Sequence, residues 1–395
     1  MQNHRLGRYE HVSAVGGEVV RAFIPPPLPP NPPVRLDGMH VLLEQANQSL
    51  GRLDGLAEVI PNIYLFLYSY VRKEAVLSSQ IEGTQSSLTD LLLYENEAAP
   101  GVPVDDVSEV SNYVMALEYG LTALPRLPMS LRLIRELHAV LLSDGRGADK
   151  TPGEFRTSQN WIGGTRPGNA TYVPPPASYV MECLGDLEKF IHDDTQDMPV
   201  LIRAGLVHVQ FETIHPFLDG NGRLGRLLIT FLLCASGALR KPMLYLSLYF
   251  KTNRDEYYRL LNEVRRTGDW ESWIRFFLIG IRETADKSVA TARRLLELSN
   301  TDRRRIEQLG RAAGSALQVF QYAQERPVFR VEEVARQSGL SIPTVTKSIQ
   351  ELTQLGMVTE LTGRKRDRVF AYQAYLAILS EDTAPLAAVN RSASV

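Results

Sequence analysis

Twelve consecutive residues, HPFLDGNGRLGR at 215–226, bring together side chains suited to phosphate chemistry. His215 titrates near neutral pH, so it can accept a proton from an attacking hydroxyl group. Asp219 offers oxygen ligands for a Mg²⁺ ion that bridges two phosphates. Arg223 and Arg226 are three residues apart, so on a helix they share one face and can bind phosphate oxygens as planar forks. This combination predicts a phosphate-binding site with a general base beside it.

The glycines within this segment predict a tight turn that opens a helix. Gly220 and Gly222 let the backbone turn closely and bring N–H groups near an anion. The apolar residues that follow predict a helix, whose N-terminal end attracts negative charge. The alternative is a glycine turn that caps a core helix, with both arginines on a solvated face. The number of suitable residue types within twelve positions favours the phosphate site.

Mostly helical segments surround this site. Apolar residues recur at helical spacing over 42–59, and a second helix is expected from 63 to about 81, ending at Gly83. Glycine and proline signals in 151–176 predict a β-hairpin instead. The arginine cluster at 303–305 is interpreted as a linker. Further helices are expected at 105–123, 129–143, 178–194, 199–212, 223–236, 253–265 and 269–296.

The composition is that of a globular chain with two or three domains. Its 395 residues are 44% hydrophobic and 22% charged, which excludes disorder and collagen-like repeats. The net charge of -2 gives no argument for binding to nucleic acid or membrane. Cys183 and Cys234 form neither a disulfide framework nor a zinc-site spacing. Without an apolar signal region or a stretch of ~20 apolar residues, we expect a cytoplasmic protein with no membrane contact.

The two ends of the chain differ from the helical region. Residues 1–35 include PPPLPPNPP and predict a proline-rich arm over the domain surface, with a docking peptide for a proline-binding partner as the alternative. Residues 313–380 contain a helix, a turn, a second helix and a basic hairpin, which is the order of a winged helix-turn-helix. Residues 381–395 are expected to be a flexible tail.

DNA binding and a protein-docking or dimerisation role are both open for residues 313–380. Between 315 and 380 there are 8 basic against 6 acidic side chains, so the charge is nearly balanced. A DNA partner would contact 344–368, through the second helix and the hairpin tip. The polar residues of this surface are Thr344, Thr346, Lys347, Ser348, Arg364, Lys365, Arg366 and Arg368.

The segment at 215–226 resembles the Fic motif, HxFxxGNGRxxR with an acid at the fifth place, and matches it at every defined position. The preceding LVHVQFETI resembles the helix that leads into this motif, and 160–176 is similar to the flap hairpin of the Fic/Doc family. The resemblance covers roughly 36–300. It implies a mainly α Fic fold, with a helical region at 36–110, a catalytic domain at 111–300 and a C-terminal winged helix-turn-helix of a kind found in bacterial members.

This resemblance implies a protein adenylyltransferase, which moves AMP from ATP to a Ser, Thr or Tyr hydroxyl of a target protein and releases pyrophosphate. His215 would deprotonate the hydroxyl, and Asp219 would hold Mg²⁺ against the α- and β-phosphates. Arg226 would reach the γ-phosphate, while the 220–223 backbone would cradle the β-phosphate. Tyr257 is assigned to the adenine–ribose pocket, with simple packing as the alternative. The flap would pair with an extended loop of the target.

The segment SSQIEG at 78–83 fits the (S/T)xxxE(G/N) pattern of Fic proteins that carry an N-terminal inhibitory helix. Ser78 and Glu82 are four residues apart and share a helix face, and Gly83 ends the helix. The resemblance implies that Glu82 pairs with Arg226 and occupies the space of the γ-phosphate. The expected ATP site comprises Glu82, Asp219, Gly220, Asn221, Gly222, Arg223, Arg226 and Tyr257.

Other functions are open. One is a DNA-binding regulator whose Fic domain only senses nucleotide, although a sensor needs no His215. Another is a Fic enzyme with different chemistry, which removes AMP or transfers phosphate, UMP or phosphocholine. Glu82, Asn221 and Arg226 favour AMP transfer, because the inhibitory contact matters only where a γ-phosphate binds. The sequence names no target protein, and self-modification and a homodimer are both open.

Overall fold

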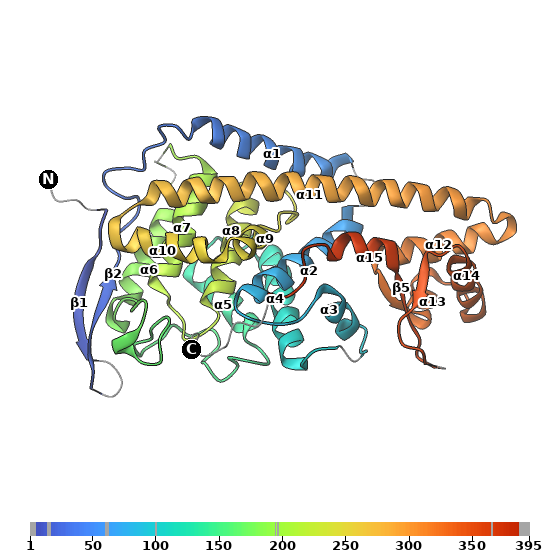
Figure 1. Cartoon of the computed structure of the whole chain (residues 1–395), viewed down its shortest axis with the longest axis horizontal. Coiled ribbons are helices and arrows are strands. Elements are labelled where there is room, and N and C mark those ends of the chain that lie inside the picture. The colour runs from blue at the N-terminus through green and yellow to red at the C-terminus, as the bar shows by residue number, and fades with distance from the viewer. Residues whose placement is uncertain are drawn as a thin grey trace.

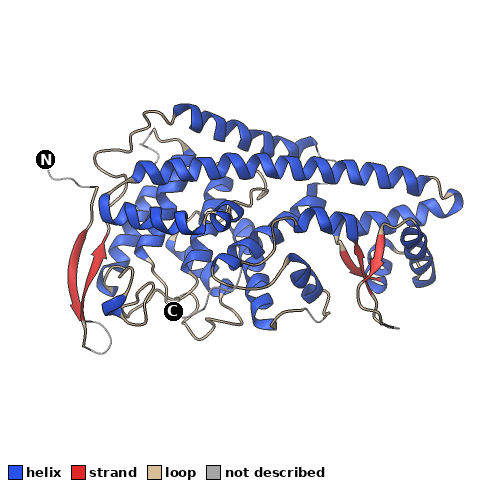
Figure 2. Ribbon diagram, viewed as in Figure 1, coloured by secondary structure: helices blue, strands red, loops and turns tan. Residues whose placement is uncertain are grey.

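The computed structural model describes residues 5–13, 17–59, 63–98, 101–193, 195, 197–364 and 366–386. Within these ranges the chain is mainly helical, as predicted, and two small antiparallel sheets lie at opposite ends of the molecule (Figures 1 and 2). None of the described helices combines the length and the apolar composition needed to cross a bilayer.

Helix α11 (Trp270–Glu307) runs along most of the molecule, and α1 (His40–Val59) lies beside it (Figure 1). Helices α7 (Val200–Ile214) and α8 (Asn221–Ala235), which flank the Fic-like turn, pack against each other in the middle of the body. The other helices of the body are α2 (Ile63–Ile81), α3 (Leu88–Glu95), α4 (Val104–Ala123), α5 (Leu131–Leu141), α6 (Ala177–Ile191), α9 (Ser247–Thr252) and α10 (Arg254–Thr267).

Small residues let the central helices approach closely. Gly205 of α7 lies against the side chains of Ile274 and Phe277 of α11. Gly225 of α8 lies so near α7 that an added Cβ atom would be 2.4 Å from a carboxylate oxygen of Glu212. Because Gly225 has no Cβ atom, the end of α7 can lie directly beside the start of α8.

Residues 1–35 contain two strands that the sequence analysis does not predict. β1 (Arg8–Ser13) and β2 (Val19–Ile24) form an antiparallel hairpin. The Phe23 N–H of β2 donates to the carbonyl of Val173 at 3.0 Å, so the hairpin extends toward the predicted flap. The predicted arm without strands is therefore wrong for residues 8–13 and 19–24. These residues form a hairpin that is hydrogen-bonded to Val173, and they precede the proline run.

The hairpin predicted in 151–176 is present as a loop closed by one β-bridge. Ile162 and Tyr172 pair in antiparallel orientation, and the Ile162 N–H donates to the Tyr172 carbonyl at 2.8 Å. The 3₁₀-helix η1 (Pro167–Asn169) forms part of the tip. We refer to residues 158–176 as the flap.

Residues 313–380 contain the helices and the strand pair in the order that the sequence predicts, together with a further short strand. The three-stranded antiparallel sheet of this region has the strand order β3-β5-β4. The winged helix-turn-helix stays our interpretation of this order, and Lys365 of the predicted basic tip lies outside the described residues. The short helix η2 (Gly310–Ala312) precedes this region, and α15 (Gln373–Ser380) ends it as a helix that the sequence does not predict. Between them lie α12 (Ala313–Glu325), β3 (Val328–Arg330), α13 (Val331–Ser338), α14 (Ile342–Gln354), β4 (Val358–Glu360) and β5 (Val369–Tyr372).

The linker predicted at 303–305 is wrong, because α11 continues through it to Glu307. Buried Asp302 accepts a hydrogen bond from Arg305 at 3.0 Å and another from the Tyr372 hydroxyl at 2.7 Å. The second bond reaches β5, so the C-terminal elements stabilise the last turns of this helix.

Residues 381–386 lie against the body, where the sequence analysis expects the start of a flexible tail. Glu381 forms two hydrogen bonds of 2.6 Å with the guanidinium of Arg294 on α11. The carbonyl of Thr383 accepts a hydrogen bond from Gln80 of α2 at 2.8 Å. Residues 387–395 lie outside the described residues. The C-terminal segment therefore contacts the end of α2 that carries the predicted inhibitory motif.

We predict that Gly120→Ala lowers the melting temperature of the protein. A Cβ atom at this position of α4 would lie 2.3 Å from the ring of Phe231 and 2.9 Å from Leu137, so α4 would have to move away from α8 and α5. Such overpacking costs about 1–3 kcal/mol. The matched control is Gly55→Ala in α1, where an added Cβ atom meets nothing within 4 Å. Thermal unfolding should show an unchanged or higher melting temperature for the control, and equal losses in both variants would contradict the packing.

Candidate active site

The turn between α7 and α8 begins with His215 in an unusual backbone conformation. Its φ of 49° lies in the left-handed region, which residues other than glycine rarely adopt. The His215 N–H donates to the Phe211 carbonyl at 2.9 Å, and its carbonyl accepts from Nε of Arg156 at 2.9 Å. These bonds hold the histidine at the end of α7, where its side chain leaves the helix.

The imidazole of His215 is neutral at neutral pH. Loss of water around the ring lowers its pKa to about 3, and the positive charges of Arg265 and Arg156 act in the same direction. Its Nδ1 atom is buried and has no hydrogen-bond partner among the described residues. A neutral imidazole is the form that can accept a proton from a hydroxyl group.

Asn221 closes the loop that joins His215 to α8. Its side chain accepts from the Phe217 N–H and donates to the Phe217 carbonyl, both at 2.9 Å. The ring of Phe217 stacks on His138 at 3.7 Å, and Nε2 of His138 lies 3.0 Å from the Asp219 carbonyl. Gly220 then enters α8 with a φ of 75°, the conformation for which glycine is suited.

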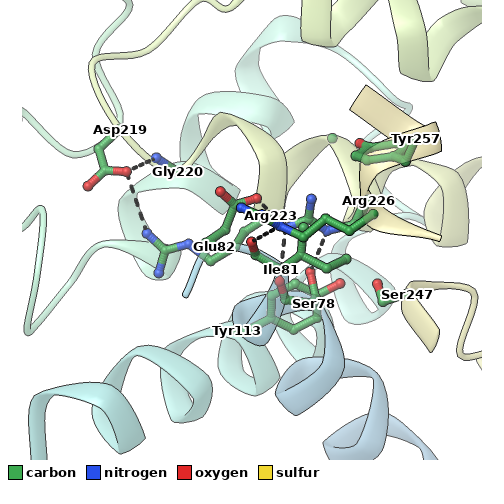
Figure 3. Close-up of polar contacts among 12 residues, drawn as sticks. Ser78, Ile81, Glu82, Tyr113, Asp219, Gly220, Arg223, Arg226, Ser247 and Tyr257 are labelled. Atoms are coloured by element: carbon green, nitrogen blue, oxygen red, sulfur yellow. Dashed lines mark hydrogen bonds and ion pairs between the residues drawn. The ribbon is translucent and has the colours of Figure 1, made fainter. Parts of the chain in front are cut away.

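Asp219 is the best candidate for a magnesium ligand. Its Oδ1 atom accepts from the Gly220 N–H at 2.6 Å and lies 3.9 Å from a guanidinium nitrogen of Arg223 (Figure 3). The side chain is partly exposed beside the start of α8. No group of three or more metal-binding side chains occurs in the described part of the chain. This donor set fits Mg²⁺, which commonly takes one or two carboxylates and completes its shell with water and substrate phosphates.

Arg223 has donor capacity left for an anion. It is buried, and one of its terminal nitrogens bonds Glu109 of α4 at 3.2 Å. Its Nε and second terminal nitrogen have no hydrogen-bond partner within the described ranges. A buried guanidinium with unused N–H groups is suited to a phosphate that arrives at the helix N-terminus.

Arg226 is paired with the predicted inhibitory motif. Its side chain is buried and donates to the Ser78 hydroxyl at 2.8 Å, the Ser78 carbonyl at 3.0 Å and Oε1 of Glu82 at 2.7 Å (Figure 3). Burial alone would raise the pKa of Glu82, but the charge and hydrogen bond of Arg226 lower it below its usual value. The pair is therefore fully ionised at neutral pH.

The Glu82 carboxylate lies over the first turn of α8. A Cβ atom added to Gly222 would be only 2.3 Å from Oε1 of Glu82. The N-terminal end of a helix attracts negative charge through its free N–H groups and its dipole. Glu82 thus occupies the place where the sequence predicts a bound phosphate.

Several contacts fix the end of α2 that carries Glu82. Gln80 donates both to the Ser86 carbonyl and to the Thr383 carbonyl, each at 2.8 Å. Arg254 of α10 donates to the Ile81 carbonyl at 3.2 Å. Gly83 follows with a φ of 99°, which ends the helix and turns the chain away.

Tyr257 packs inside the body. Only 1% of its surface is exposed, and its ring stacks on Phe250 at 4.7 Å. Its hydroxyl lies 2.9 Å from Nε2 of buried His208. Its assignment to an adenine–ribose pocket stays a prediction, whereas the other predicted site residues meet around the start of α8.

Sequence reasoning missed four polar groups around this centre. Arg156 and Arg265 lie on either side of the His215 turn. Burial raises the pKa of Glu74, which accepts from the Ser247 N–H at 3.1 Å, to about 7. Burial likewise raises the pKa of Glu212 to about 7, and its Oε1 has no hydrogen-bond partner in the described part of the chain. Single polar residues in buried helices and loops form no pattern, so the sequence offered no signal beyond the nearness of Glu212 to His215.

Together these residues form a site for an anion beside a neutral base. The arginines and the N-terminus of α8 can bind phosphate groups, Asp219 can hold a divalent cation, and His215 can take up a proton. This set is suited to the in-line attack of a hydroxyl on a phosphoryl group.

Part of this chain is similar in sequence to proteins named protein adenylyltransferases. The protein adenylyltransferase fic-1 of Caenorhabditis briggsae is 30% identical over 202 residues, which are 50% of this chain and 37% of that protein. The fic-1 protein adenylyltransferase of Caenorhabditis elegans is 29% identical over 247 residues, or 61% of this chain and 44% of the relative. The chain thus spans less than half the length of these two relatives.

The fold has a solved counterpart. A Fic family protein from Desulfovibrio desulfuricans G20 superposes with a TM-score of 0.55 at 18% identity, over 84% of this chain and 95% of that one. Residues 40–122 match the Fic/DOC family N-terminal domain, and residues 128–233 match the Fic/DOC family domain, which contains the His215 turn and most of α8. This chain therefore carries a Fic/DOC family N-terminal domain followed by a Fic/DOC family domain.

Proposed function

We propose that this protein is an adenylyltransferase that moves AMP from ATP to a hydroxyl group of a protein. The observation that carries the proposal is the place of His215 in the turn that leads into α8, whose N-terminus forms an anion site with Arg223 and Arg226. The names of the relatives support the same activity. The chain spans only part of these relatives, so we assign it no particular target protein.

In the proposed reaction, His215 accepts the proton of a Ser, Thr or Tyr hydroxyl while the oxygen attacks the α-phosphorus of ATP. The new P–O bond forms as the bond to pyrophosphate breaks, and pyrophosphate leaves with its negative charge. Arg223 and the amides at the start of α8 stabilise this charge. Mg²⁺ held by Asp219 would supply further charge neutralisation. Catalysis then depends mainly on positioning and electrostatics.

We further propose that Glu82 keeps this activity low. An anion that is to use Arg226 must displace a carboxylate already bonded to it at 2.7 Å. The γ-phosphate of ATP is the group that would compete for this position. Without the contact to Arg226, ATP would bind with its phosphates out of line for attack.

Glu82→Gly should raise the transfer of label from α-labelled ATP to protein by about 10- to 100-fold, the range expected for loss of one charge-assisted hydrogen bond. The acceptors are the protein itself and the proteins of a cell extract, with Mg²⁺ present. His215→Ala in the same background should abolish transfer, because no base remains for the hydroxyl. Label from the γ-phosphate should not appear on protein.

Two results would contradict this account. Protein-bound label from the γ-phosphate would indicate phosphate transfer instead of AMP transfer. Equal incorporation by the parent and Glu82→Gly would refute the inhibitory role of Glu82, whatever the chemistry.

The pH at which protonation of His215 begins to lower kcat/KM should be far below the pKa that is usual for histidine. Since the pKa of His215 is lowered to about 3, its protonation stops proton uptake only in strong acid. Loss of Glu82 removes a negative charge that raises this pKa, so the pKa of His215 in Glu82→Gly lies no higher than in the parent. We expect kcat/KM of Glu82→Gly to stay level as pH falls from about 8 to about 5 when Glu74 and Glu212, whose own pKa values lie near 7, are replaced by Gln in the same background. Circular dichroism checks that the protein remains folded, and a halving of kcat/KM near pH 6.5 would contradict the prediction.

A further inference from the structure

Two buried arginines flank His215 without a carboxylate partner. Arg156 and Arg265 are 3% and 7% exposed, and neither forms an ion pair with any described residue. Burying an unpaired guanidinium is costly, so its hydrogen bonds must offset a large loss of hydration. The bonds of Arg156 go to main-chain carbonyls around the His215 turn, whereas Arg265 bonds one such carbonyl, the Thr213 hydroxyl and the side chain of Asn262.

Arg156 ties both stems of the flap to the histidine. Its Nε donates to the His215 carbonyl at 2.9 Å, and Nη2 donates to the Pro175 carbonyl at 2.5 Å and the Ile214 carbonyl at 3.4 Å. Nη1 donates to the Ser158 carbonyl at 3.1 Å. One side chain therefore joins the two ends of the flap, at Ser158 and Pro175, to the backbone of His215.

Arg265, which lies on α10, also contacts both the end of α7 and the flap. Its guanidinium donates to the Glu212 carbonyl at 3.0 Å and to the Thr213 hydroxyl at 3.2 Å. It also stacks on the ring of Tyr172 in the flap at 3.9 Å. The Tyr172 hydroxyl in turn donates to the Thr213 carbonyl at 2.8 Å.

The last carbonyls of a helix carry partial negative charge and lack partners within the helix. At the end of α7 these carbonyls are bonded by the two arginines and by flap side chains. Asn160 of the flap adds a bond to the Phe217 carbonyl at 3.0 Å. The flap and the turn that carries His215 are thus connected by side chains from both sides.

We propose that Arg156 and Arg265 are positioning residues that hold the flap and the His215 turn as one rigid unit. This inference rests on the proposed function and on the expectation from the sequence that an extended segment of the target protein pairs with the flap. A hydroxyl group on that segment then arrives at a fixed distance from the imidazole. The arginines act through the backbone of residues 212–217 and contact neither nucleotide nor target.

The test compares Arg156→Met and Arg265→Met with their parent, Glu82→Gly. Methionine keeps much of the length of the side chain but removes every hydrogen bond to the carbonyls. Arg156→Lys keeps the charge but can bond fewer carbonyls at once, so it should show an intermediate effect. Arg266→Met is the matched control, because this neighbour on α10 is exposed and, among the residues that the structure describes, pairs with Glu263 alone.

Both methionine variants should lower kcat for AMP transfer by about 100-fold while KM for ATP stays unchanged, since misplacement by about 1 Å has an effect of this size. Amide hydrogen exchange, which does not depend on the reaction, should become faster at Ile162, Tyr172 and His215. Arg266→Met should change neither quantity. A merely structural role predicts instead that kcat, ATP binding and melting temperature fall together.

The proposal is overturned if exchange in the flap and the turn stays at the parent rate in both methionine variants. It is also overturned if the parent transfers AMP and both variants keep its kcat. If the parent transfers no AMP, the proposed function fails separately. Faster exchange at Ile162, Tyr172 and His215 would then still support the rigid unit.

Discussion

The contact between Arg226 and Glu82 is the interaction on which the state of this site depends. It joins residues 144 positions apart, one at the end of α2 and the other in the second turn of α8. Arg226 is almost completely buried, so its charge needs an anion beside it. In the structure described here Glu82 is that anion. A phosphate group of the right geometry is the natural replacement, because it can offer the same oxygen atoms to the same guanidinium.

The surrounding structure maintains this contact from several sides. Gln80 binds the carbonyl of Thr383, which follows the C-terminal helix α15, and Arg254 binds the carbonyl of Ile81. The position of Glu82 is therefore linked to two segments that follow the 215–226 motif in the chain, α10 and the residues after α15. The His215 turn and the flap form a second group of contacts, in which Arg156 and Arg265 take part. In the proposed reaction, one group of residues binds the nucleotide, the other positions the protein substrate, and His215 lies between them.

Much of the site could be predicted from the sequence, because the chemistry requires particular residue types at short spacing. His215, Asp219 and the arginines of α8 lie within twelve residues, and a turn followed by a helix brings them together without help from distant segments. The motif at 78–83 was predictable only through resemblance, since nothing local shows which cation Glu82 meets. Arg156 escaped prediction because its partners are backbone carbonyls, which leave no trace in the sequence.

The central claim is that Glu82 and the γ-phosphate of ATP compete for Arg226. Isothermal titration of ATP and ADP into the parent and Glu82→Gly, with Mg²⁺ present, tests it directly. The account predicts that the substitution strengthens ATP binding clearly more than ADP binding, because only ATP has a group that can take the vacated place. An equal change for both nucleotides, or no change for either, would contradict the claim.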